Sequence, residues 1–170
     1  MSSFTNFDPA TSVIKNEYAS KFFNWDYRVV TKSFSYDIGF KGSNQQVIIP
    51  QGFLTDGASI PKALSKYIPP WGKYGAAAIV HDYLCETLQI VDQGQPRLIT
   101  RKKADKIFFE AMGVLEVPLI VRVCFYLAVR AWVIYNKGNK PIVSYKKRTI
   151  ENKLTEYYYI HGNYDYKDEL

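Results

Sequence analysis

Residues 76–88 read AAAIVHDYLCETL, and the apolar residues of this stretch recur at the spacing of a helix. The positions that share one face, at i, i+4, i+7, i+8 and i+11, are Ala77, His81, Leu84, Cys85 and Leu88. The stretch therefore predicts a packed helix with a histidine among the apolar residues of its buried face. An imidazole in such a place needs a hydrogen-bond partner.

Two further helices are predicted after this one. Thr100 is expected to cap a helix whose apolar stripe runs to Leu115, and residues 118–135 form a third, strongly apolar segment. The third segment carries Arg122 and Arg130, and these charges favour a core helix over a membrane span.

The residues before the first helix have the pattern of strands. Residues 27–40 alternate and are rich in β-branched and aromatic residues, residues 41–44 are typical of a turn, and residues 46–49 read QVII. This predicts a β-hairpin. Residues 50–61 are expected to form a structured loop that leads into a helix, with Ser59 as its cap and Pro61 in its first turn. The expected fold is α+β, with a small antiparallel β unit followed by a bundle of about three main helices.

Length and composition suggest one globular domain with additions at both ends. The chain has 170 residues, of which 47% are hydrophobic, and this is enough for one substantial core. We expect an N-terminal arm over 1–25, the globular domain over 26–136, and a basic, tyrosine-rich extension over 137–170. The extension either wraps the domain or serves as an attachment arm, because tyrosine gives a large contact area at low entropy cost.

Charge and cysteine content point to no specific partner. The net charge of +6 permits contact with nucleic acid or phospholipid head groups, but a solvated basic surface is the favoured interpretation. No nucleic-acid-binding motif is present. Cys85 and Cys124 both fall in apolar helical segments, which is typical of reduced cysteines in a cytosolic protein.

His81 is the best candidate for chemistry. Adjacent residues on a helix point about 100° apart, so Asp82 cannot easily orient the His81 ring, and the carboxylate that does so must come from another helix. Asp105, at the edge of the second helix's apolar face, is the best placed. A His81–Asp105 pair would be able to take a proton from water. The alternatives are that His81 is a satisfied core residue, and that Asp105 is a solvated carboxylate paired with Arg101 or Lys106.

Asp82 is then left to bind a hard cation, helped by carbonyl oxygens or by a second carboxylate, Asp56, from the Thr55-Asp56-Gly57 loop. The alternative for Asp56 is a turn in which its side chain bonds the local backbone. A zinc site at His81 and Cys85 is not expected, because no other histidine or cysteine forms a cluster with them. Ser59 as a nucleophile is a third choice, since no Gly-x-Ser-x-Gly motif surrounds it.

Several ordered motifs carry a family resemblance over roughly residues 26–136. They are the PQGFLTDGASIP run at 50–61, PPWGKY at 69–74, AAAIVHDYL at 76–84, ADKIF at 104–108, Ala111-Met112 and YLAVR at 126–130. On these motifs the chain resembles a family of bacteriophage and prophage proteins of unknown function. The resemblance implies a protein of the host cytoplasm, in which it is made, or one that is incorporated in the virion.

A second, local likeness is to phospholipases of the A-two type, in which a helical His-Asp supplies the base and a calcium ligand. This likeness implies that His81 is the base, Asp82 a calcium ligand and Asp105 the residue that orients the base. Cys85 stands where both patterns favour tyrosine.

Two functions of different classes follow. The first is a hydrolase with a His/Asp centre, calcium-assisted and acting on an ester such as a phospholipid. The second is a non-catalytic virion or assembly protein, in which the same residues form a structural polar network and the C-terminal extension binds other phage proteins.

Overall fold

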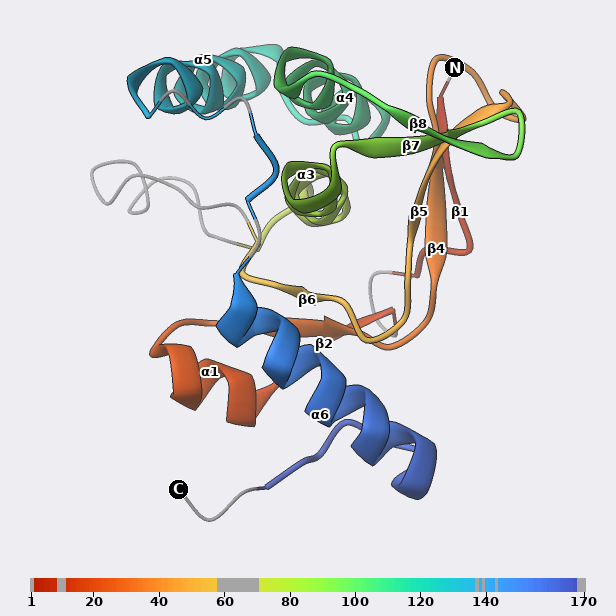
Figure 1. The fold of residues 1–170 in the computed structure, drawn as a ribbon. Helices are drawn as coiled ribbons and strands as arrows, with labels where there is room; N and C mark the ends of the chain where they lie inside the picture. The colour runs from red at the N-terminus through yellow and green to blue at the C-terminus, as the bar shows by residue number, and fades with distance from the viewer. Residues whose placement is uncertain are drawn as a thin grey trace.

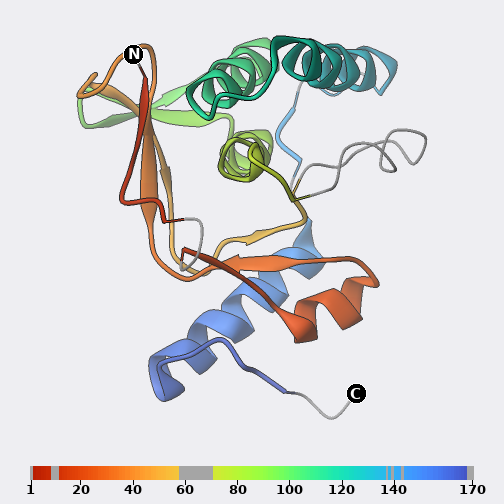
Figure 2. The ribbon, with the colours of Figure 1, turned by 180° about the vertical axis from the view of Figure 1, so that it is seen from behind.

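The computed structural model of the chain describes residues 2–8, 12–57, 71–136, 138, 140–142 and 144–167. It has an α+β fold built around one helix, α3 (Gly75–Thr87). Figures 1 and 2 show α3 between the larger sheet, the pair α4 and α5, and a smaller sheet. This position explains why eight residues of α3 are buried, including Ala77, Val80 and His81.

The larger sheet has five antiparallel strands in the order β1-β4-β5-β7-β8. Their bounds are β1 (Ser3–Thr5), β4 (Phe34–Asp37), β5 (Gln45–Ile49), β7 (Gln89–Asp92) and β8 (Gln95–Leu98). The predicted hairpin is its centre, since β4 pairs with β5 in a register that places Tyr36 opposite Val47. Both of these side chains are fully buried in the main core.

The smaller sheet has three antiparallel strands in the order β2-β3-β6. They are β2 (Val13–Lys15), β3 (Arg28–Val30) and β6 (Leu54–Thr55). The register sets Lys15 opposite Arg28 and Arg28 opposite Thr55. Residues directly opposite each other in antiparallel strands project from the same face, so these three side chains form one row across the sheet.

Helices α4 (Arg101–Val114) and α5 (Leu119–Tyr135) begin and end close to the bounds that the sequence predicts. The Thr100 side chain caps α4 by accepting a hydrogen bond from the Lys103 backbone N–H. The buried residues of α4 include the predicted stripe from Ala104 to Met112. None of the helices within the described ranges combines the length and apolar composition that crossing a membrane requires.

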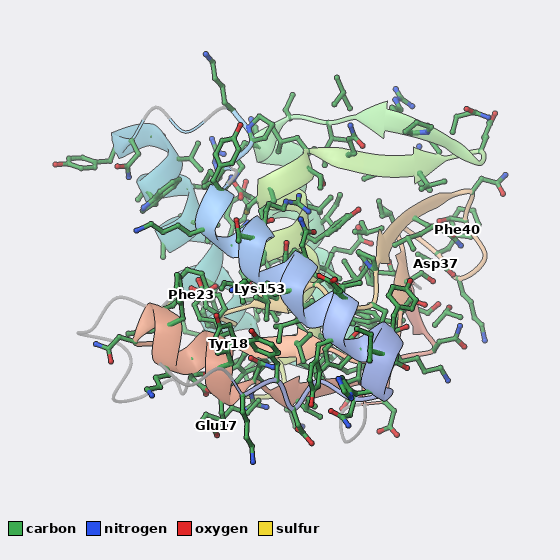
Figure 3. The ribbon with its side chains drawn as sticks, turned by 60° about the horizontal axis from the view of Figure 1, so that its bottom comes forward. Glu17, Tyr18, Phe23, Asp37, Phe40 and Lys153 are labelled. Carbon is green, nitrogen blue, oxygen red and sulfur yellow. The ribbon has the colours of Figure 1, made fainter. Side chains whose placement is uncertain are left out.

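Helices α1 (Glu17–Phe23) and α6 (Tyr145–His161) cover the face of the small sheet opposite the row of Lys15, Arg28 and Thr55. A second core forms there, in which Val29 and Leu54 of the sheet pack with Tyr18 of α1 and with Ile150 and Leu154 of α6. Figure 3 brings α6 forward and shows Tyr18 close to it, on the inner side of α1. The C-terminal helix therefore packs onto the same body as the N-terminal residues.

The α+β class is confirmed, and the number of helices and the extent of the sheets differ from the prediction. The described ranges hold five helices, where about three main ones were expected. Residues 27–40 are divided between β3 and β4, which belong to different sheets. Residues 89–98, for which the sequence predicted no strand, form the β7–β8 hairpin with Gln93 and Gly94 at its turn. The expected cap Ser59 and Pro61 lie outside the described residues.

Candidate functional site

The structure brings His81 of α3 and Asp105 of α4 into direct contact. His81 Nε2 lies 2.8 Å from Asp105 Oδ1, and the two residues are 7% and 0% exposed. The contact arises because both residues lie on the faces with which α3 and α4 pack together. The predicted proximity of the two side chains is thus present in the fold.

Asp105 also binds two arginines, which sequence reasoning did not place with it as a group. Arg130 of α5 donates from Nη1 to Asp105 Oδ2 at 2.8 Å, and Arg101 Nε lies 3.8 Å from Oδ1. Burial alone would raise the pKa of Asp105, but the hydrogen bonds from His81 and Arg130 outweigh it and lower the pKa. Asp105 is therefore an anion at neutral pH.

The negative charge of Asp105 determines which ring nitrogen of His81 carries the proton. Burial lowers the pKa of His81, although the hydrogen bond to Asp105 acts in the opposite direction. The ring is consequently neutral at pH 7 and carries one proton. Because an ionised carboxylate can only accept, that proton sits on Nε2, and the lone pair is on Nδ1.

Two neighbours enclose the ring. Phe108 stacks on it with the ring centroids 4.6 Å apart, and Cys85 Sγ lies 3.6 Å from both ring nitrogens. A sulfur equally far from both nitrogens cannot lie in line with the lone pair of Nδ1. Burial also raises the pKa of the Cys85 thiol, so this cysteine is a packing group beside the imidazole and not a reactive thiolate.

Asp82 projects in a direction about 100° away from that of His81, as adjacent positions on a helix do. Its Oδ2 accepts a hydrogen bond from Thr55 Oγ1 of β6 at 2.5 Å, and the same hydroxyl accepts from the Gly57 backbone N–H at 3.1 Å. Burial raises the pKa of Asp82 well above its usual value, and the negative charge of Asp56 raises it further. Asp56 and Asp82 are therefore near enough to repel each other.

The raised pKa of Asp82 predicts a specific pH dependence of stability. The folded chain holds the Asp82 proton to higher pH than the unfolded chain, so the stability contribution falls as pH rises from about 4 through the folded pKa. Asp82→Asn lacks this group. In urea unfolding with a chelator present, the stability of Asp82→Asn relative to the wild type should increase as pH rises from 4 to 7.

A constant difference between Asp82→Asn and the wild type across this pH range would contradict the assignment.

A second polar cluster lies one turn further along α3 than Asp82, and the sequence analysis did not predict it. Lys147 of α6 binds Glu86, one turn after Asp82, and its Nζ lies 3.8 Å from Glu151. Glu151 Oε1 accepts a hydrogen bond from the Leu54 backbone N–H at 2.9 Å. The spacing of Asp82 and Glu86 at i, i+4 was the available signal, because two acidic side chains on one helix face require a cation nearby.

The other predicted site residues are the cation ligands Asp56 and Asp82 and the alternative nucleophile Ser59. Within the described residues, no group of three or more histidine, cysteine, aspartate or glutamate side chains is arranged to hold a metal ion. Asp56 and Asp82 would therefore supply two carboxylates, and other oxygen ligands would have to complete a calcium site. Ser59 lies outside the described residues.

Comparison with known proteins gives a family and no reaction. A family model described as protein of unknown function (DUF1353) matches residues 29–129, well over half of the 170 residues. This match lies within the predicted domain and includes His81, Asp82, Asp105 and Asp56. No curated protein and no solved structure matches the chain. The phage origin of the family stays a prediction. The chain belongs to the DUF1353 family of proteins of unknown function.

Proposed function

We propose that this protein is a phage-encoded hydrolase that cleaves an ester such as a phospholipid, with His81 as its general base. The observation that carries the proposal is the 2.8 Å contact between His81 Nε2 and the fully buried Asp105. A neutral imidazole with its proton held on Nε2 has its second nitrogen available to accept a proton. Asp105 acts here as the group that positions the ring.

In the proposed reaction, His81 Nδ1 removes a proton from a water molecule, and the oxygen of that water attacks the ester carbonyl carbon. The proton then passes from His81 to the leaving alcohol oxygen as the carbon–oxygen bond breaks. Arg130 and Arg101 hold Asp105 in its anionic form throughout, because both lie within 4 Å of its oxygens. This arrangement maintains one ring tautomer during turnover.

Asp82 and Asp56 are the proposed ligands of a calcium ion. The donor set fits a hard cation, since it consists of two mutually repelling carboxylates with the Thr55 hydroxyl beside them. Calcium bound there would polarise the ester carbonyl and stabilise the developing oxyanion. With two carboxylates, we expect a dissociation constant of roughly 10⁻⁴–10⁻³ M, as for weak extracellular calcium modules.

A second function is favoured by the enclosure of the ring. His81 is only 7% exposed, with Phe108 on its face and Cys85 beside it. A non-catalytic virion or assembly protein would use the same residues as a buried polar network that fixes the core. Such networks need satisfied partners and no access for a substrate.

Calcium titration by calorimetry, combined with hydrolysis assays on phospholipid vesicles, distinguishes the two functions. The hydrolase predicts calcium binding by the wild type and by Asp92→Asn, loss of binding in Asp82→Asn, and calcium-dependent release of fatty acid by the wild type. Wild-type protein that neither binds millimolar calcium nor cleaves the vesicles would contradict the hydrolase and favour the structural network.

A further inference from the structure

The face of the small sheet that is turned toward α3 carries a cationic side chain, that of Arg28. Val29 and Leu54 occupy the face that packs on α1 and α6, so Arg28, whose side chain alternates with that of Val29, projects from the opposite face. Thr55 is the direct cross-strand partner of Arg28, and its hydroxyl binds Asp82. Arg28 is therefore a neighbour of the Asp82 site, although it lies far from it in the sequence.

Arg28 and Trp71 together present two buried hydrogen-bond donors that have no acceptor among the described residues. The Arg28 guanidinium carbon lies 4.2 Å from the centre of the Trp71 ring, which keeps the two side chains together. Arg28 Nε and Trp71 Nε1 are both buried, and neither has a hydrogen-bond partner among the described residues. Two buried donors in this condition are costly unless an acceptor binds there.

Asp26, which forms an ion pair with Arg28, does not supply that acceptor. Asp26 Oδ2 lies 4.0 Å from Arg28 Nη2, beyond hydrogen-bond distance, and Asp26 Oδ1 is itself buried without a partner among the described residues. Lys15, which stands opposite Arg28 in the register, is engaged by Glu17 at 2.9 Å. Lys15 and Asp26 also line a shallow hollow of about 450 Å³, with Ser20, Asn24 and Trp25. Lys15, at one end of the row, and Asp26, the ion-pair partner of Arg28, therefore adjoin space that a small group can enter.

We propose that Arg28 and Trp71 form an anion subsite that holds a phosphoryl group next to the Asp82 carboxylate. The planar guanidinium fork matches the oxygens of a phosphate, and the indole N–H adds a further donor from the side. This inference rests on the proposed function, because it makes the substrate of that centre a phosphate-bearing ester. The phosphoryl group would belong either to a lipid head group or to a free phosphate.

The test is calorimetric titration of the full chain with inorganic phosphate, and separately with a short-chain phosphatidylcholine below its micelle concentration. Arg28→Gln should weaken phosphate binding at least about tenfold, because it removes charge-assisted hydrogen bonds. Trp71→Phe keeps an aromatic ring, removes only the N–H, and should weaken binding about two- to tenfold.

Asp26→Asn removes the negative charge beside Arg28 and should tighten binding. Arg97→Gln, an exposed arginine paired with Asp92, is the matched control and should bind like the wild type.

The outcomes separate this subsite from the hydrolase. Binding of both ligands assigns the lipid head group, and binding of phosphate alone assigns a free phosphate. The subsite is overturned if the wild type binds neither ligand, or binds acetate as tightly as phosphate, even if phosphate-free esters are cleaved. It is also overturned if Arg28→Gln and Trp71→Phe both bind phosphate as tightly as the wild type. If Arg28→Gln does not fold, unchanged binding in Trp71→Phe and Asp26→Asn overturns the subsite. Phosphate binding that depends on Arg28 and Trp71, without any hydrolysis, would uphold the subsite and refute the proposed function.

Discussion

Replacement of Asp105 by alanine is expected to lower the free energy of unfolding by about 3–5 kcal/mol, the cost of removing one partner from a buried ionic network. The carboxylate is fully buried and joins three helices, since it binds His81 of α3 and Arg130 of α5 from its place on α4. Its removal leaves Arg130 without this acceptor and Arg101, which is 6% exposed, without its nearby charge. Urea unfolding at pH 7 measures the loss.

Asp92→Ala is the matched control for this experiment. Asp92 also binds an arginine, with Arg97 Nη1 2.5 Å from its Oδ2, but the Arg97 side chain is 64% exposed. Because solvent screens such pairs, we expect a loss of about 1 kcal/mol or less. A loss in Asp105→Ala as small as that in Asp92→Ala would show that the network does not hold the three helices together.

The main helices and the central hairpin could be predicted because their signals are local. The spacing of Ala77, His81 and Leu84 defines α3, and Thr100 caps α4 where a cap was expected. The β7–β8 hairpin could not be recognised in the same way. All four residues of β8 are exposed, and they include Pro96, so neither alternation nor β propensity marks this strand.

Strands β1 and β2 were missed for a different reason. Each has only three residues, and each is stabilised by pairing with a strand more than ten residues away. The split of residues 27–40 is likewise set by tertiary pairing, because β3 pairs with β2 and β6 while β4 pairs with β1 and β5. No local pattern distinguishes one long strand from two short strands in different sheets.

The same difference between local and tertiary signals applies to the residues of the candidate site. His81 and Asp105 could be paired from the sequence because His81 lies on the apolar stripe of its helix, Asp105 lies at the edge of the stripe of its own helix, and stripes of neighbouring helices pack together. Arg130, Lys147 and Glu151 could not be placed, because their partners depend on how α5 and α6 dock onto the rest of the chain. Arg28 and Trp71 came together only once the strand register was known.

His81→Gln is expected to lower the rate of ester hydrolysis by about 10²–10⁴-fold, the usual contribution of a positioned general base. Glutamine can still donate an N–H to Asp105, so it preserves the buried hydrogen bond, but its amide cannot accept the proton of water at neutral pH. The initial rate on phospholipid vesicles at saturating calcium measures the effect, and the melting temperature of His81→Gln should stay close to that of the wild type.

The pH profile separates a catalytic role from a structural role for His81. Burial lowers the pKa of the ring, so its base form predominates at pH 7, and the wild-type rate should fall as the pH is lowered through this reduced pKa. Cys85→Ala, which removes the sulfur beside the ring, should keep this acid limb because Cys85 is a packing group. A residual rate in His81→Gln with the same acid limb would assign the base to another residue. If His81→Gln loses thermal stability while its rate per folded molecule is unchanged, the pair with Asp105 serves the fold alone.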